Sequence, residues 1–142
     1  MERTLFIVKP DAVERNLIGK ILAQVESQGF RVVHARLAHL TRAQAEGFYA
    51  EHKERPFFPD LVTYMTSGPV LLLGLEREGA VKKLREVVGA TDPLQADHGT
   101  VRKLFGIDKQ RNSVHASDSA ASAERELEFF FSGRPSQGFS ES

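Results

Sequence analysis

Short apolar runs at four places along the chain predict β-strands. Residues 5–8 and 70–75 are nearly continuous apolar stretches, which favours strands buried on both faces. Between them, Val33, Ala35 and Leu37 alternate with other residues within 31–40, a period-two pattern typical of a strand. Residues 114–116 are long enough only for a short fourth strand.

Apolar stripes at helical spacing predict three amphipathic helices. The stripes are Ile18/Ile21/Leu22/Val25, Val81/Leu84/Val88 and Ala120/Ala123/Leu127/Phe130. Gly29 and Gly89 follow the first two, where glycine accepts the positive φ that often ends a helix. Asp118 precedes the third stripe and is expected to cap it.

Two further segments are predicted from local signals. Thr41 and Gln44 have the spacing of a capping box, so a helix should begin near Thr41 and run to about Glu51. The prolines of residues 55–59 should break it, with a short helix over 60–65. Residues 90–111 show no period, and a loop of that length inside a compact domain is often functional.

The order of these elements is strand–helix repeated four times, with one helix-turn insertion. Two split βαβ units on one sheet match that order. We therefore expect an α+β fold, a ferredoxin-like α/β sandwich with a four-stranded antiparallel sheet covered by helices. The strand order stays open. One domain should cover residues 1–131, followed by a short Ser/Gly-rich tail at 132–142.

Composition narrows the function classes. The chain has no cysteine, which excludes disulfides, thiolate metal sites and a cysteine nucleophile. Its 19 basic and 19 acidic residues balance, which argues against a protein that coats nucleic acid or binds it specifically. The first apolar run leads directly into Lys9-Pro10-Asp11, unlike a signal peptide, and no run is long enough to span a bilayer. We expect a cytoplasmic enzyme or binding protein.

The stretch from Arg111 to Asp118 is the strongest candidate for chemistry. It places His115 at the end of a predicted strand, just before a helix N-terminus that favours anions. Neutral imidazole is a good nucleophile near pH 7, so a phosphate could be drawn to this ring and react with it. A lone histidine can equally fill a strand end. The P-loop and the protein-kinase motifs are missing from the sequence.

From about Arg3 to Phe131 the chain resembles the nucleoside diphosphate kinase family. The similarity lies in the joint order and spacing of several blocks. They are residues 4–13 (TLFIVKPDAV), Phe48-Tyr49 with 55–58 (RPFF), 67–70 (SGPV), 89–93 (GATDP), 99–102 (GTVR) and 112–119 (NSVHASDS).

The resemblance implies an enzyme that moves the γ-phosphate of an NTP, mainly ATP, to an NDP by a ping-pong mechanism. His115 matches the family's catalytic histidine, which attacks through Nδ1 and becomes a phosphohistidine. Glu126 matches the carboxylate that binds the other ring nitrogen, and Ser117 matches a serine bonded to that carboxylate. Lys9 matches a phosphate-contacting lysine, and Tyr49 a tyrosine beside it.

The resemblance also implies the nucleotide-binding residues. Arg85, Thr91 and Arg102 match groups that hold the β- and γ-phosphates. Asn112 matches the residue that bonds the sugar 3′-hydroxyl, and Phe57 the aromatic ring on which the base stacks. Mg²⁺ is the implied cofactor, held mainly by the nucleotide phosphates. Asp118 and the other histidines are interpreted as structural or surface residues: His34, His39, His52 and His98.

The chain departs from the family pattern at three places, of which the less typical segment 103–109 is one. The family motif has glycine directly after the catalytic histidine, where this chain has Ala116, which a negative φ would accommodate. The tail after Phe131 is short and unlike the ends of family members. Family members are homo-oligomers, tetramers or hexamers built from dimers, and C-terminal segments help to set which; a tetramer or hexamer is therefore expected.

Two other functions compete with this interpretation. One is a nucleotide-binding regulatory protein that has lost catalysis, although His115, Glu126 and Lys9 are all present. The other is a phosphohistidine relay protein whose partner is a protein. A relay domain needs no nucleotide-clamping residues, so the match of Phe57 and Arg102 argues against it.

Overall fold

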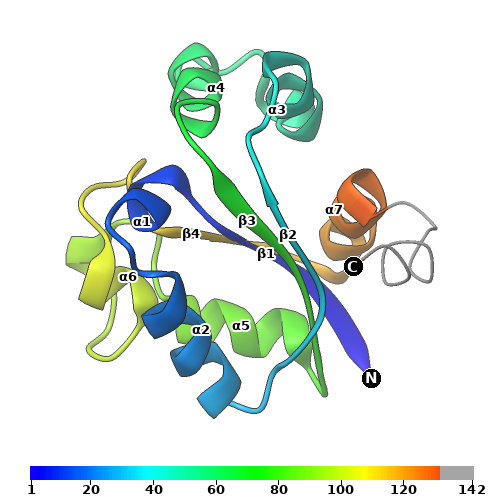
Figure 1. The fold of residues 1–142 in the computed structure, drawn as a ribbon, viewed down its shortest axis with the longest axis vertical. Helices are drawn as coiled ribbons and strands as arrows, with labels where there is room; N and C mark the ends of the chain where they lie inside the picture. Colours follow the sequence, from blue (N-terminus) through cyan, green and yellow to red (C-terminus); the bar gives the residue numbers. More distant parts are fainter. Residues whose placement is uncertain (132–142) are drawn as a thin grey trace.

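One four-stranded antiparallel sheet organises the chain in the computed structural model, which describes residues 1–131 (Figure 1). The strand order is β2-β3-β1-β4. The strands are β1 Glu2–Val8, β2 Arg31–Ala38, β3 Val70–Arg77 and β4 Val114–Ala116. β1 pairs with both β3 and β4, so the strand that precedes Lys9 lies beside the strand that carries His115.

The sheet and its helices have the predicted ferredoxin-like arrangement. The longer helices are α2 Ile18–Ser27, α3 Arg42–Phe48, α4 Phe58–Met65, α5 Ala80–Val88 and α7 Ala120–Phe131. The shorter ones are α1 Pro10–Glu14, η1 Ala50–His52, η2 Pro93–Gln95 and α6 Val101–Phe105. Among residues 1–131, none of these helices has the length and hydropathy needed to cross a membrane.

Alternate residues of β1 divide the core into two parts. Phe6 and Val8 pack with the apolar residues of α2 and α5 on one face of the sheet. Leu5 and Ile7 pack on the other face with those of α3, α4 and α7. Because all four are fully buried, the predicted two-sided burial of this strand is confirmed.

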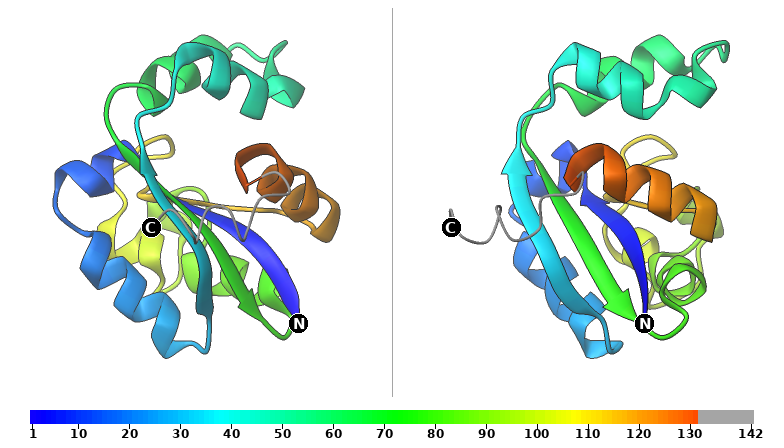
Figure 2. Two further views of the ribbon diagram at one scale, coloured as in Figure 1. Left: turned by 45° about the vertical axis from the view of Figure 1, so that its right-hand side comes forward. Right: turned by 90° about the vertical axis from the view of Figure 1, so that its right-hand side faces the viewer.

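The segment of residues 41–65, called the arm below, contains α3, η1 and α4 and connects β2 to β3. Figures 1 and 2 show α3 and α4 together beyond one end of the sheet. The capping box at Thr41 and Gln44 is formed as predicted. However, the helix ends at Phe48 and not near Glu51, because the chain turns there into the 3₁₀ turn η1.

Other predicted boundaries also needed correction. Ser119, and not Asp118, caps α7: its hydroxyl accepts from the Ser122 amide at 3.0 Å. Ala120, assigned to the core face of α7, is exposed, whereas Ala123 and Phe130 are buried.

The aperiodic stretch 90–111 contains η2 and α6, each too short to show a stripe. The expected Ser/Gly-rich tail at 132–142 lies outside the described residues.

Candidate active site

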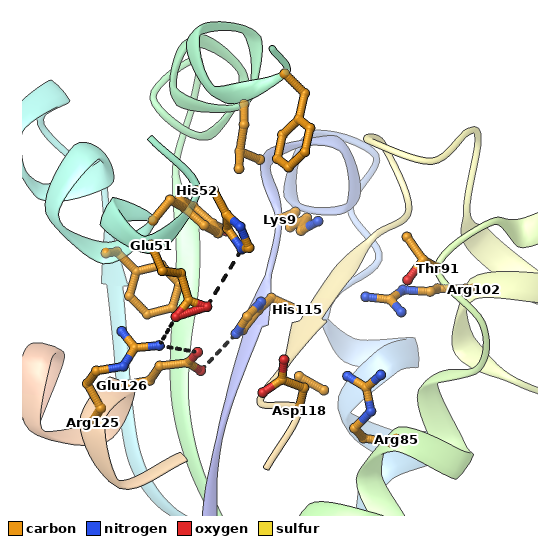
Figure 3. Close-up of a pocket in the computed structure, with 15 residues that line it drawn as sticks. Lys9, Glu51, His52, Arg85, Thr91, Arg102, His115, Asp118, Arg125 and Glu126 are labelled. Carbon is orange, nitrogen blue, oxygen red and sulfur yellow. Dashed lines mark hydrogen bonds and ion pairs between the residues drawn. The ribbon is translucent and has the colours of Figure 1, made fainter. Parts of the chain in front are cut away.

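A cavity of about 250 Å³ opens between the arm, α5 and α7, above the ends of β1 and β4 (Figure 3). Most of the predicted site residues line it: Lys9, Tyr49, Phe57, Arg85, Thr91, Arg102, His115 and Glu126. Asn112 and Ser117 do not line the cavity, but each bonds a residue that does. Residues separated by more than a hundred positions are therefore brought to one place.

His115 sits in the middle of β4, opposite Ile7 of β1, and its ring enters the cavity. Its Nε2 lies 2.9 Å from Glu126 Oε1. An ionised carboxylate only accepts hydrogen bonds, so Nε2 carries the proton and Nδ1 keeps a free lone pair. Burial lowers the pKa of His115, and the nearby Lys9 and Arg102 charges add to this against the opposing effect of Glu126. The ring is therefore neutral and nucleophilic at physiological pH.

One carboxylate oxygen of Glu126, Oε1, has two hydrogen-bond partners. Ser117 Oγ donates to Oε1 at 2.7 Å, in addition to the His115 ring. Burial of Glu126 opposes its ionisation, but hydrogen bonds from His115 and Ser117 and the charge of Arg125 together leave its pKa below the usual value. A carboxylate in this position fixes the tautomer and orientation of the imidazole.

Lys9 follows directly after β1 and is only 7% exposed. Its Nζ donates to Asn112 Oδ1 at 3.0 Å. Burial and the Arg102 charge lower the pKa of Lys9 to about 7, although Asp11 acts in the opposite sense. The Asn112 amide in turn donates to the Thr91 and Lys109 carbonyls, both at 2.9 Å. The Asn112 side chain therefore connects Lys9 to the loop that contains Thr91.

Arg102 provides a second buried cation. It projects from α6 and donates to the Gly89 carbonyl at 3.1 Å and to the Val114 carbonyl at 2.8 Å. Burial and the neighbouring Arg85 lower its pKa to about 10. Its Nε is buried with no hydrogen-bond partner among the described residues. Four Lys and Arg side chains line the cavity against three carboxylates, and this excess of positive charge favours an anionic ligand.

Aromatic side chains of the arm close the other side of the cavity. The Phe48 ring meets the His115 ring edge to face, with centroids 5.3 Å apart. The Tyr49 hydroxyl is buried with no partner within the described part of the chain, and burial raises its pKa. Phe57 stands at the mouth and is 46% exposed, so one face of its ring is accessible to a ligand.

The cavity wall also contains residues that were not among the predicted site residues. They are Phe48, Glu51, His52, Leu61, Ala116, Asp118 and Arg125. His52 and Asp118, interpreted from the sequence as surface or structural residues, also lie in this wall. His52 lies three positions after Tyr49, and the helix-like turn of η1 brings both to the same side. The three-residue spacing from Tyr49 is the only feature of the sequence that could have predicted His52 in the cavity wall.

A buried aspartate organises the loop before β4. Asp11 accepts from Arg15 at 2.9 Å, from the Ser113 amide at 3.3 Å and from the Tyr64 hydroxyl. Ser113 has φ of 77°, a conformation that non-glycine residues rarely adopt. The Asp11 contacts hold this strained residue, which lies between Asn112 and the strand of His115.

Comparison with known proteins agrees with the geometry of the cavity. The family model described as nucleoside diphosphate kinase matches residues 2–135. The nucleoside diphosphate kinase of Pasteurella multocida is 60% identical over 131 residues, which cover 92% of this chain and 94% of that protein. The one from Sorangium cellulosum is 56% identical over 133 residues, covering 94% and 92%.

Solved structures give the same result. The Aquifex aeolicus nucleoside diphosphate kinase superposes with a TM-score of 0.91 at 47% identity, covering 93% of this chain and 96% of that one. The halophilic enzyme from Halobacterium salinarum, solved in complex with CDP, superposes with a TM-score of 0.89 at 40% identity, covering 92% and 87%. Sequence, fold and cavity therefore agree, and the chain belongs to the nucleoside diphosphate kinase family.

Proposed function

We propose that His115 is the phosphoryl carrier through which this nucleoside diphosphate kinase transfers the γ-phosphate of an NTP, mainly ATP, to an NDP. The observation that carries the assignment is the orientation of the ring. Glu126 occupies Nε2 at 2.9 Å, so the unprotonated Nδ1 is left for attack inside a cavity lined by cations. A covalent carrier lets one cavity serve donor and acceptor in turn.

The first half-reaction forms one bond and breaks one. The Nδ1 lone pair of His115 attacks the γ-phosphorus, and the bond to the bridging oxygen breaks. Its electron pair leaves with the NDP. The imidazole gains positive charge while Nε2 keeps its proton, and the Glu126 carboxylate stabilises that charge. The second half-reaction is the reverse, with another NDP as the acceptor.

Fixed cations supply most of the stabilisation that such a transfer needs. Lys9 and Arg102 are buried and already held by neighbouring groups, so they need little reorganisation when the phosphate enters. Arg85 and Thr91 lie on the same wall and complete the β- and γ-phosphate contacts. The unpartnered Tyr49 hydroxyl is a donor beside the reacting group.

The nucleoside is proposed to lie between the mouth and the Asn112 loop. The exposed Phe57 ring offers a stacking face, and stacking reads no base edge. This arrangement favours acceptance of all common bases. Asn112 is proposed to bond the 3′-hydroxyl of the sugar. Its side-chain amide, which donates to the Thr91 and Lys109 carbonyls, would then also donate to that hydroxyl.

Mg²⁺ is the proposed cofactor, bound mainly by the nucleotide phosphates and water. Within residues 1–131, no group of three or more histidine or carboxylate side chains could hold a metal ion without the nucleotide. The wall does contain the carboxylates of Glu51 and Asp118, hard oxygen donors of the kind that Mg²⁺ prefers. The ion would neutralise charge on the triphosphate.

The proposal extends to the protein's state in the cell. Nucleoside di- and triphosphates are its small-molecule partners, and we propose a cytoplasmic homo-oligomer, a tetramer or hexamer built from dimers. An inactive regulatory protein is disfavoured because His115, Glu126 and Lys9 are assembled as a site. A protein-to-protein relay is disfavoured because the ring lies in a cavity lined by Arg85 and Arg102.

A pulse and chase tests the proposed function. The enzyme is incubated with γ-labelled ATP and Mg²⁺, and GDP is then added. We expect an acid-labile phosphoenzyme that discharges into GTP. His115→Ala should abolish labelling, whereas His98→Ala, at an exposed histidine outside the cavity, should not. Labelling of the His115→Ala protein would refute the assignment, and a label that GDP fails to remove would favour the relay.

A further inference from the structure

Arg125 lies at the edge of the cavity and has no part in the mechanism above. It precedes Glu126 in α7, and its Nη2 lies 2.9 Å from Glu51 Oε1 and 3.7 Å from Glu126 Oε2. Figure 3 shows the resulting chain of contacts, from Glu51 through Arg125 and Glu126 to the His115 ring. Arg125 thus links the turn η1 of the arm to the carboxylate behind the nucleophile.

The two oxygens of Glu126 face different groups. Oε1 accepts from Ser117 and pairs with His115 Nε2, whereas Oε2 faces the Arg125 guanidinium. Only 8% of the Glu126 side chain is exposed, against 46% of the Arg125 side chain, so water screens this interaction only from the arginine side. The same Arg125 nitrogen pairs with Glu51, so one guanidinium group contacts both carboxylates.

The basicity of Glu126 matters most while the phosphoryl group is on the ring. With phosphorus on Nδ1 and a proton on Nε2, the imidazole is positively charged and releases the phosphoryl group readily. A more basic carboxylate would draw the Nε2 proton away, and the neutral ring would donate more electron density to the P–N bond. The second half-reaction therefore depends on a carboxylate that accepts a hydrogen bond without removing the proton.

We propose that Arg125 is a positioning residue of phosphoryl transfer: anchored by Glu51, it neutralises the second oxygen of Glu126 and so keeps the Nε2 proton on the His115 ring. The inference rests on the proposed role of His115 as carrier. The guanidinium stands behind the carboxylate, and the carboxylate binds Nε2, so Arg125 acts from the side of the ring opposite the phosphorylated nitrogen.

A tether between α7 and the arm is the competing explanation for the same contacts. Both partners of the pair are about half exposed, at 46% for Arg125 and 51% for Glu51, and such pairs contribute little to folding. A tether would change the fraction of correctly folded enzyme or its affinity for nucleotide. A purely structural tether would not change the equilibrium between free and phosphorylated enzyme at a given ratio of ATP to ADP.

That equilibrium is the decisive measurement. Phosphoenzyme is quantified in acid-quenched mixtures over a series of ATP to ADP ratios for wild type, Arg125→Gln and Arg125→Lys. In Arg125→Gln, the more basic Glu126 should draw the Nε2 proton away from the ring. The less charged ring strengthens the P–N bond, which shifts the constant about threefold toward phosphoenzyme. Discharge to GDP should slow by more than phosphoenzyme formation does. Arg125→Lys keeps the charge and should restore most of the wild-type constant.

Arg42→Gln is the matched control, because Arg42 is an exposed arginine of the arm whose partner, Glu46, lies outside the cavity wall. It should leave the constant unchanged. If Arg125→Gln had the wild-type equilibrium constant, or one shifted toward free enzyme, the proposed role of Arg125 would be wrong. The proposed role of His115 would be unaffected. Absence of labelling in the wild type would overturn the proposed carrier, and this inference with it.

Discussion

The charge of Lys9 is expected to depend on what occupies the cavity. Burial and Arg102 hold its pKa near 7 in the free protein, so at pH 8 most of its amine is neutral. A bound diphosphate favours the ammonium form and should return the pKa toward 10.5. Binding between those two values must therefore take up a proton, whereas below pH 7 the lysine is charged before and after binding.

We expect calorimetry of Mg-ADP binding at pH 8, in buffers of different ionisation enthalpy, to give an uptake of about one proton. His115 does not interfere, because its pKa lies below 6.5 and it is neutral at that pH. Lys20→Met, at an exposed lysine of α2, should leave the uptake unchanged, and Lys9→Met should abolish it. An uptake near zero in the wild type would show that Lys9 is already charged in the free protein.

Single residues also show where sequence reasoning reaches its limit. Ala116 lies in β4 and is absent from the positive-φ positions of the described chain, so alanine is accommodated there without backbone strain, as the negative-φ condition required. Glu51, His52 and Arg125 were not predicted, because an isolated charged residue in a sequence is usually solvated. Their place in the cavity wall depends on how the arm packs against α7.

At the scale of elements, the C-terminal end of α5 positions Thr91 and Arg102, two of the proposed phosphate-binding residues. Gly89 has φ of 91°, and a Cβ built there would stand 2.6 Å from Thr100 Oγ1. Its carbonyl accepts from Arg102 at 3.1 Å, and Thr91 follows two residues later. The glycine therefore combines a left-handed turn with a close approach that a side chain would block.

Gly89→Ala should lower the free energy of unfolding by about 2 kcal/mol, through backbone strain and overpacking together. Nucleotide affinity should fall as well, because a displaced Gly89 carbonyl weakens one of the two hydrogen bonds that hold Arg102. Chemical denaturation and ADP titration measure the two effects. Gly19→Ala in α2, where the added Cβ meets nothing within 4 Å, should be neutral or slightly stabilising. If the two variants had the same free energy of unfolding and the same ADP affinity, Gly89 would not position the phosphate-binding residues.

Elements with a strong period were predictable, and short ones were not. The stripes of α2 and α5 span whole helical turns, and the glycines after both helices take positive φ as expected. α1 and α6 contain five residues each, too few for a stripe. Tertiary contacts stabilise them, such as the Arg15 bond to the Phe105 carbonyl.

At the scale of the whole molecule, the strand order brings the two halves of the site together. No local pattern distinguishes β2-β3-β1-β4 from other orders, because strand pairing is decided by packing over long sequence separations. The order nevertheless places Lys9, after the second-last strand of the sheet, beside His115 on the last. The resemblance to a known family predicted this proximity, which periodicity alone could not.

Assembly is the prediction that belongs to the molecule as a whole. β2 is an edge strand of the four-stranded sheet and carries Leu37, which is 61% exposed in the isolated chain. Monomeric proteins usually protect such edges. Light scattering on the full-length protein should give four or six times the chain mass of 15.8 kDa. A particle of monomer mass at micromolar concentration would contradict the proposed oligomer.

The position of phosphorus on the phosphoenzyme tests the central claim most directly. Enzyme labelled with ¹⁵N-histidine and phosphorylated by ATP can be examined by ³¹P- and ¹⁵N-detected magnetic resonance. Because Glu126 occupies Nε2, we expect phosphorus bonded to Nδ1 of His115 and a proton retained on Nε2. Phosphorus on Nε2, or on any residue other than His115, would contradict the mechanism.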